Sequence, residues 1–503
     1  TTWLSGPLVR EQRYRAKAGG IDVALDVTTP AVGPARIDVI LRNDAAQNKG
    51  IAKAIYRTQV RFSGRLLYDT AEITHHPYQT WHAVIYSDGA PPPRVTPDPK
   101  LLIMLGATPH YGAYQPDPEV VAAMHASAMR AGPPLSSTAN VTPYMPTTGG
   151  RADIGPLPAW AVFYLLDPSR RNQETLLANA DAAGAVPWHV RDVEQDGPIS
   201  VERHPKVWLD YRGELEPGVL ERKYAPTDEV WTIDDGHQPS LTYLPYLLTG
   251  SQYYRDELAM QAGFVLLAVS PTYRRGAEGS VLPAQLRGIA WNLRTLATAA
   301  YILPTADPYQ AYFEAKRRSN LDEMNRRFVR EGELDAAGEL VGYVPGAYDE
   351  EHTAPWQDDY LVMVLGWIHA MGFTEARPIL AWMTNFVAGR FTNAARGYDP
   401  LYGTAYEFHI ADPRSKAPLN TWASAFKASF DPSKGALTSL DQPDWAGGYA
   451  ALARASLASL NNAAPSPRAA AAYAYVKSQT PRMEASYSKE PAFAIVPIRG
   501  DAR

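Results

Sequence analysis

Trp231 to Phe264, WTIDDGHQPSLTYLPYLLTGSQYYRDELAMQAGF, is the stretch on which the predicted fold depends. It begins with a loop that carries three titratable residues, Asp234, Asp235 and His237. A short apolar helix follows, and Gly250 ends it, because glycine readily takes the left-handed conformation at a helix C-terminus. The residues after Gly250 predict a second, amphipathic helix. The stretch therefore predicts a helical hairpin whose first loop holds more titratable groups than packing requires.

Similar hairpins recur through the C-terminal two-thirds of the chain. Apolar and amphipathic helical patterns alternate, and each apolar helix is predicted to begin just after a proline, which fits the first turn because that N–H has no helical partner. These prolines are Pro158, Pro239, Pro283, Pro355, Pro418 and Pro443. Inner helices of a double-layered ring touch neighbours on every side, whereas outer helices show one face to water. We therefore expect a ring of helix pairs whose leading loops meet at one opening.

The N-terminal part of the chain predicts strands instead. Apolar and polar residues alternate at 21–27, 37–41, 56–62 and 81–85, which is typical of half-buried strands. Leu101 to Leu105 is a continuous apolar run, and we expect it to be a buried strand. Several short strands in succession are typical of an antiparallel sandwich.

These patterns divide the chain into three predicted segments. We expect a β-sandwich domain at residues 1–131, a linker or lid loop at 132–157, and a ring of helix pairs at 158–503. The predicted fold class is therefore multidomain α+β, with an N-terminal antiparallel β-sandwich followed by an (α/α)6 toroid.

Composition narrows the functional classes. A chain of 503 residues is too long for one ordinary core. The net charge of −5 argues against a nucleic-acid surface, and the chain holds no apolar run of about 18 or more residues that would insert into a membrane. Without cysteine, disulfide and thiolate chemistry are excluded. The 12 Trp and 29 Tyr residues suit sugar-stacking clefts, because an aromatic ring covers a sugar face while its polar tip stays wet.

A strand-rich domain joined to a ring of helix pairs resembles the (α/α)6-toroid carbohydrate-active enzymes, which include glycoside hydrolases and polysaccharide lyases. Three stretches are similar to uncharacterised bacterial and phage proteins: IGPLPAWAVFYLL at 154–166, DDGHQPSLTYLPYLLTG at 234–250 and QLRGIAWNLRTLATAAYI at 285–302. The resemblance implies a polysaccharide or oligosaccharide substrate and an extracellular, periplasmic or virion-associated protein. The order of the two domains, with the sheet first, favours hydrolases such as glucoamylase-like enzymes.

Hydrolysis requires two carboxyl groups, one protonated to donate to the leaving oxygen and one ionised. Asp235 and Glu351 lie in the leading loops of adjacent predicted hairpins at the opening, and Asp358, Asp359 and Asp444 are substitutes. The adjacent carboxylates of Asp234 and Asp235 would raise one pKa and so provide an acid near neutral pH. The predicted substrate-binding residues are Trp231, Gln238, Trp291, Asn292, Trp356, Gln357, Tyr406 and Trp445.

Two alternatives remain open. A polysaccharide lyase would use His237 as base, Tyr243 as acid and Arg287 with Asn292 to neutralise a uronate, although an acidic opening would repel an anionic substrate. A non-catalytic glycan-binding or virion-associated structural protein would hold sugars without cleaving them. We expect no cofactor or structural metal, with Ca²⁺ as the one cation that clustered carboxylates would favour. The sequence does not define the oligomeric state.

Overall fold

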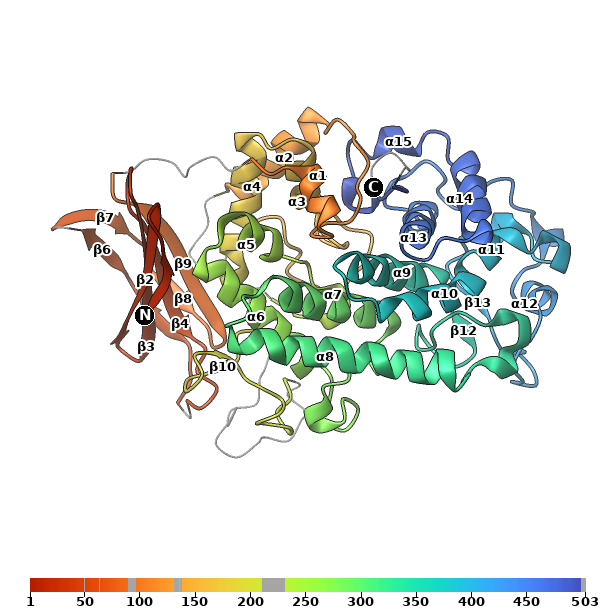
Figure 1. Ribbon diagram of the computed structural model, residues 1–503, viewed down its shortest axis with the longest axis horizontal. Coiled ribbons are helices and arrows are strands. Elements are labelled where there is room, and N and C mark those ends of the chain that lie inside the picture. Colours follow the sequence, from red (N-terminus) through yellow and green to blue (C-terminus); the bar gives the residue numbers. More distant parts are fainter. Residues whose placement is uncertain are drawn as a thin grey trace.

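The computed structural model describes residues 1–48, 50–62, 64–88, 96–130, 135, 138–209 and 231–498. Within them the protein is of the α+β class, with an antiparallel sheet at the N-terminal end and helices through most of the remainder (Figure 1). The prediction of strands followed by helices is therefore confirmed at this level. No helix in the described ranges is long and apolar enough to cross a membrane.

The main sheet has five antiparallel strands in the order β1-β2-β3-β4-β9. Their bounds are β1 Thr2–Ser5, β2 Val9–Ala18, β3 Ile21–Pro30, β4 Arg36–Asn43 and β9 Gln79–Tyr86. Two small ladders accompany the sheet: β5 Ala54–Tyr56 with β8 Ile73–His75, and β6 Gln59–Phe62 with β7 Arg65–Asp69. The alternation at 21–27, 37–41 and 81–85 predicted β3, β4 and β9 correctly.

The expected buried strand at Leu101 to Leu105 is wrong, because these residues belong to helix α1 (Pro99–Met104) and its C-terminal cap. Asp98 caps the helix by accepting hydrogen bonds from the backbone N–H groups of Lys100 and Leu101. A cap followed by proline starts a helix regardless of how apolar the following residues are. Leu101 and Leu105 are exposed.

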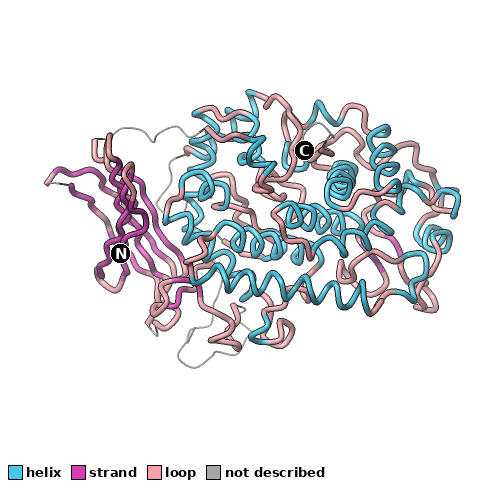
Figure 2. The backbone as a smooth tube through the Cα atoms, viewed as in Figure 1, coloured by secondary structure: helices cyan, strands magenta, loops and turns pink. Residues whose placement is uncertain are grey.

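Helix α2 (Pro118–Ala128) was not predicted. It begins in the same way, with Asp117 as its cap and proline at its first position. It packs against α3 (Ala159–Leu166) and α4 (Arg170–Asp181), so this part of the predicted 1–131 segment lies with the helices (Figure 2).

The remaining elements are mainly helices. Their bounds are β10 Arg191–Asp192, β11 Gly197–Pro198, α5 Tyr243–Thr249, α6 Gln252–Leu267, α7 Leu286–Ile302, α8 Pro308–Met324, β12 His352–Thr353, α9 Pro355–Ala370, α10 Ala376–Val387, α11 Gly389–Thr392, β13 Phe408–His409, α12 Trp422–Ser429, α13 Tyr449–Ala463, α14 Pro467–Gln479 and α15 Met483–Ser486.

Successive helix pairs pack side by side. Helix α7 contacts α6, α8 and α9, and α9 in turn contacts α10 and α13. Helix α13 contacts α14 and the single turn of 3₁₀ helix at Pro491–Phe493, and this turn contacts α3. The long α8 runs along the outside of α7 (Figure 1).

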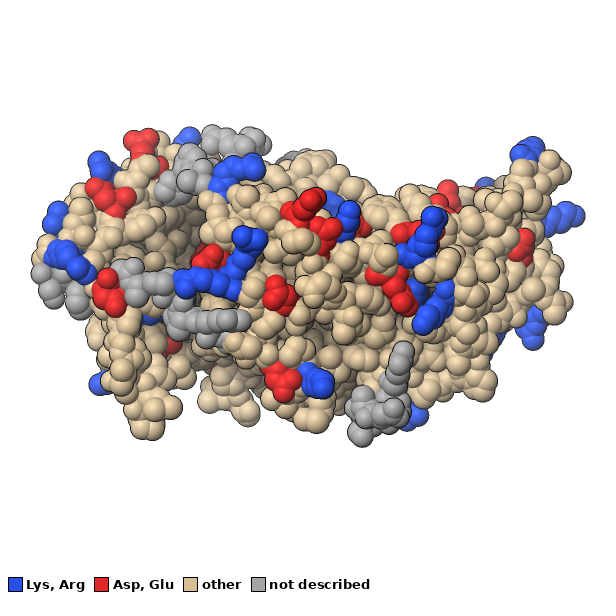
Figure 3. Space-filling view, turned by 90° about the horizontal axis from the view of Figure 1, so that it is seen from above, with Lys and Arg blue, Asp and Glu red and all other residues tan. Residues whose placement is uncertain are grey.

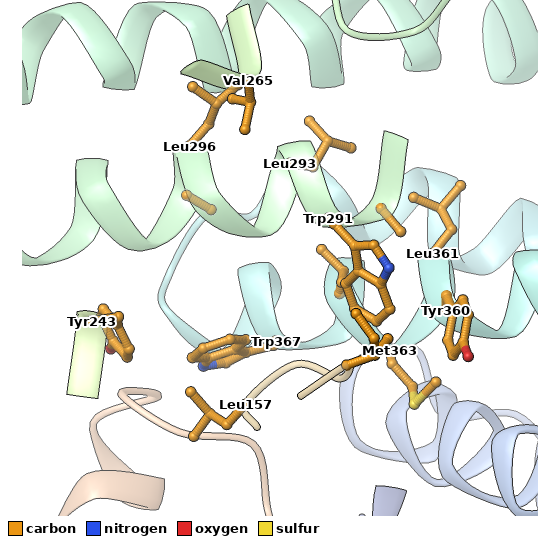
Figure 4. Close-up of a cluster of buried hydrophobic side chains, with 14 of the residues drawn as sticks. Leu157, Tyr243, Val265, Trp291, Leu293, Leu296, Tyr360, Leu361, Met363 and Trp367 are labelled. Carbon is orange, nitrogen blue, oxygen red and sulfur yellow. The ribbon is translucent and has the colours of Figure 1, made fainter. Parts of the chain in front are cut away.

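The core lies between α7, α9 and the loops that cover them (Figure 4). Trp291 of α7 packs against Tyr360 of α9 with ring centroids 4.8 Å apart, and Tyr243 meets the edge of Trp367 at 5.6 Å. The prediction that the helix after Gly250 is amphipathic is wrong, because nearly every residue of α6 is buried. One side of α6 packs on α7, and Asp256 on α6 pairs with Arg13 of β2 at 2.6 Å.

Candidate functional site

An aromatic cleft of about 400 Å³ lies where α7, α9 and α13 begin. Its lining residues are Thr148, Gly149, Gly150, Arg287, Trp356, Tyr360, Tyr406, Gln442, Trp445, Gly447, Tyr449 and Leu452. Four residues of the predicted site therefore meet here: Arg287, Trp356, Tyr406 and Trp445. A larger hollow of about 610 Å³ lies between strand β9 and helix α4, but none of the predicted site residues lines it.

The aromatic rings of the cleft form a continuous stack. Trp356 lies face to face with Tyr406 at a centroid distance of 5.9 Å and with Tyr449 at 6.0 Å. Tyr406 also stacks on Tyr348 at 5.7 Å, and their hydroxyl groups share a hydrogen bond. Tyr406 is 48% exposed and Trp445 41% exposed, so both present aromatic surface to a ligand. Such surfaces suit the apolar faces of sugar rings.

The acidic loop of the opening stretch borders this cleft. Asp234 accepts a hydrogen bond from Nδ1 of His237. A β-carbon added to Gly236 would lie 3.3 Å from Asp234 Oδ2 and 3.6 Å from Nε of Arg287, so the loop lies close to a residue that lines the cleft. Burial alone would raise the pKa of Asp234, but the hydrogen bond with His237 and nearby positive charge keep it below its usual value.

Asp235 has the opposite electrostatic environment. Burial, followed by the charge of Asp234, raises the pKa of Asp235 to about 6. Nδ2 of Asn292 donates a hydrogen bond of 2.8 Å to Asp235 Oδ2. Two neighbouring carboxyl groups with pKa values shifted in opposite directions can serve as one proton donor and one ionised group.

A chain of buried amides holds Asn292 in place. Gln261 Nε2 donates to the carbonyl of Pro239 and to Gln238 Oε1, each at 2.6 Å. Gln238 Nε2 then donates to Asn292 Oδ1 at 3.1 Å, which leaves the Asn292 amide nitrogen directed at Asp235. The predicted residues Gln238 and Asn292 therefore support Asp235 from within the core, and both are fully buried.

His237 is oriented for proton transfer. Its Nδ1 is bound to Asp234, and its Nε2 is buried without a hydrogen-bond partner in the described part of the protein. A histidine held by a carboxylate at one nitrogen can accept or donate a proton at the other.

Glu351 and Asp358 do not line the cleft. Glu351 lies on a surface loop and pairs with Lys416 at 2.7 Å. Asp358 is fully buried at the start of α9, where its Oδ1 accepts a hydrogen bond of 3.0 Å from the backbone N–H of Val344. Burial raises the pKa of Asp358 well above its usual value. The carboxyl group of Asp358 thus binds the loop that contains Val344 to the start of α9.

Three further predicted residues belong to the core. Trp231 and Trp291 are almost completely buried, and Tyr243 donates a hydrogen bond of 2.7 Å to the carbonyl of Ala107. Gln357 is also buried, but its Oε1 accepts a hydrogen bond of 3.1 Å from the backbone N–H of Arg287 and so supports a wall of the cleft.

The structure adds residues that the sequence reasoning missed. A β-carbon on Gly447 would lie 2.9 Å from both Oε2 of Glu490 and the ring of Trp445, so this carboxyl group lies beside the cleft. Burial raises the pKa of Glu490, and also that of Asp441. Nothing in the sequence near Glu490 indicates this position. By contrast, Tyr360 follows Trp356 by one helical turn and could have been found from that spacing.

No group of three or more histidine or acidic residues in the described ranges is arranged to hold a metal ion. Comparisons of the chain with protein families, with curated proteins and with solved structures found no match.

Proposed function

We propose that this protein is a glycan-degrading enzyme that cleaves glycosidic bonds in the aromatic cleft. The observation that carries the proposal is the contact between the acidic loop and Arg287, because Arg287 lines a cleft whose aromatic rings are partly exposed. Aromatic rings bind sugars without needing charge, and the loop supplies the groups that protonate and deprotonate.

Hydrolysis is the proposed reaction. Asp235, with a pKa of about 6, is the proton donor to the leaving oxygen. We assign the role of the second carboxyl group to Glu490, which lies beside Trp445 of the cleft. This carboxyl group activates water or attacks the sugar directly. A separation of about 5 Å between the two carboxyl groups would give retention of the sugar's configuration, and a separation of about 6.5–9.5 Å would give inversion.

Elimination is the second candidate, and one observation favours it. The lining of the cleft contains Arg287 and the tyrosines Tyr360, Tyr406 and Tyr449, whereas the carboxyl groups stand beside it. Arg287 would neutralise a uronate carboxylate, His237 would remove the proton next to it, and a tyrosine would protonate the leaving oxygen.

We propose that the architecture is a toroid preceded by a sandwich. The succession of contacts from α6 through α7, α9 and α13 to the turn at Pro491–Phe493 and on to α3 supports a ring. Tyr68 of β7 packs against Trp81 of β9 at 5.9 Å, which favours the β6–β7 ladder as part of a second layer. We place the enzyme where it meets polysaccharide, outside the cell, in the periplasm or on a virion.

Incubation with a polysaccharide panel tests the proposal. New reducing ends without ultraviolet absorbance indicate hydrolysis, and reducing ends with the absorbance of an unsaturated uronate indicate elimination. Substitution D235N should abolish hydrolysis, whereas H237A should abolish elimination, and each should leave glycan binding intact. If the wild-type protein binds a glycan but forms neither product, a glycan-binding structural protein is supported instead. If the wild-type protein shows no binding and no cleavage, a glycan function is refuted.

A further inference from the structure

We infer that the glycan in the aromatic cleft carries an acid group, which the guanidinium of Arg287 binds. This inference rests on the proposed function only in placing a glycan in the cleft, and it adds the substrate class: a sugar with an anionic substituent, such as a uronate or a sulfated ring.

Arg287 is held in place but not neutralised. Its Nε donates a hydrogen bond of 2.8 Å to Gln285 Oε1, and its guanidinium carbon lies 5.8 Å from the ring centroid of Trp356. Its two terminal nitrogens make no hydrogen bond or ion pair with any residue in the described ranges. A planar guanidinium with both terminal nitrogens free matches the two oxygens of a carboxylate or sulfate.

The acidic groups that the sequence placed around the opening have other partners. Glu351 pairs with Lys416 at 2.7 Å, and Asp444 pairs with Arg482 at 2.8 Å. Acidic and basic side chains lie beside one another in the same way on the face seen in Figure 3. Among the residues known to line the cleft there is no aspartate or glutamate, and Arg287 is the charged one. The expected repulsion of an anionic substrate by an acidic opening is therefore weak.

Three helices add positive potential at the same place. Arg287 and Trp356 are the second residues of α7 and α9, and Tyr449 is the first residue of α13. The amino ends of helices favour anions, because their backbone N–H groups carry partial positive charge. Nε1 of Trp356, a residue only 5% exposed, has no hydrogen-bond partner in the described part of the chain.

The nearest carboxyl groups do not cancel this potential. Asp234 is paired with His237. Burial raises the pKa values of Asp235, Asp441 and Glu490, so each becomes charged only at a higher pH than an exposed carboxyl group does.

Isothermal titration calorimetry tests the inference, with all variants in a D235N/H237A background so that neither hydrolysis nor elimination cleaves the glycan. The ligands are uronate-containing oligosaccharides, the same oligosaccharides after carboxyl reduction, and sulfated neutral oligosaccharides. We expect R287M to weaken binding of the acidic ligand by roughly tenfold to a hundredfold, as for a lost hydrogen bond to a charged group. R287K should retain part of the affinity. The matched control R275M removes an exposed arginine paired with Glu278 and should change nothing.

Preference for uronate or for sulfate identifies which acid group Arg287 binds. Equal binding of the carboxyl-reduced ligand, unchanged binding by R287M, or no binding of any acidic ligand would overturn the inference. The comparison of reduced with acidic ligand needs no variant at position 287, so it holds even where R287M fails to fold. Cleavage of neutral glycans alone would refute the acidic substrate and leave the proposed function standing. If the wild-type protein binds acidic glycans without cleaving them, the proposed enzymatic function is refuted and the acidic ligand of Arg287 stands.

Discussion

At the scale of single residues, Asp235 links the proposed catalysis to stability. Its carboxyl group lies against Asn292 and beside the charge of Asp234, and burial raises its pKa from 3.8 to about 6. The folded protein therefore binds this proton more tightly than the unfolded chain does. The resulting stabilisation is complete below about pH 4 and is lost as the pH rises through 6. Above pH 6 the fold carries the charge of this carboxylate at a cost in stability.

D235N should consequently be inactive and more stable than the wild-type protein at pH 7–8. An asparagine keeps an oxygen that can accept from Asn292 but carries no charge. We expect turnover to fall by at least about a hundredfold and the free energy of unfolding to rise by about 1 to 3 kcal/mol. Denaturant unfolding at pH 4 and pH 8 measures the second effect, which should vanish at the lower pH. Lower stability at pH 8 would show that Asp235 is not a buried charge.

The pH dependence of turnover should report the same group. If Asp235 donates the proton, the kcat should fall as the pH rises above about 6, because the acid form disappears. A profile of kcat between pH 4 and pH 9 measures this limb. A kcat that stays constant to pH 9 would assign the proton donor to another residue.

At the scale of elements, α6 supports the acidic loop through α7. The amides of Gln261, Gln238 and Asn292 form the hydrogen-bonded chain that ends at Asp235. Since each amide has its orientation fixed by the one before it, the chain acts as a unit. Residues on α6 can therefore influence Asp235 without touching the substrate.

Q261L tests this link. It removes the bonds to Gln238 and to the carbonyl of Pro239, and we expect a loss of about 1 to 3 kcal/mol in stability. We also expect the apparent pKa of the kcat profile to rise, because the bond from Asn292 lowers the pKa of Asp235. Q310L is the control: Gln310 donates one hydrogen bond to the carbonyl of Ala300, far along the chain from Asp235. A loss of stability in both variants with no pH shift in Q261L would refute the link.

Sequence patterns predicted elements better than they predicted which elements are buried. The prolines and apolar runs located α3, α7 and α9, because these signals are local. Helix α6 was expected to show one face to water, but Asp256 and its neighbours on that face are covered by the sheet. Burial of charged residues by a distant strand leaves no local trace in the sequence.

At the scale of the whole molecule, the same limit explains the candidate site. Asp235, Arg287 and Trp356 could be predicted because each lies at or just before the start of an apolar helix. Glu490 could not, because only the packing of the C-terminal segment brings it to Trp445. Glu351 shared the sequence features of a rim residue, yet Lys416 on a separate loop holds it at the surface.

The joint between the sheet and the helices should make stability depend on pH. His82 of β9 bonds Asp38 of β4 at 2.9 Å, lies 3.3 Å from Asp181 of α4, and stacks on Tyr253 of α6. Burial lowers the pKa of His82, but the two carboxylates outweigh it and raise the value from 6.5 to about 9. The stabilisation by this charged histidine is complete below pH 6.5 and is lost as the pH rises through 9.

H82Q should therefore be destabilised at pH 6 by about 1 to 3 kcal/mol, with a smaller difference from the wild-type protein at pH 9.5. Thermal unfolding across this range measures the difference. H125Q is a matched control, since His125 pairs with Glu174 at a half-exposed position. A difference between H82Q and wild type that is equal at pH 6 and pH 9.5 would mean that His82 is neutral throughout.

The most direct test of the central claim is a crystal structure of D235N with an uncleaved oligosaccharide. The account predicts a sugar ring stacked on the aromatic rings of the cleft, an acid group on Arg287, and the glycosidic oxygen within hydrogen-bonding distance of residue 235. A glycan bound in another hollow, or an aromatic cleft that stays empty at saturating ligand, would contradict it.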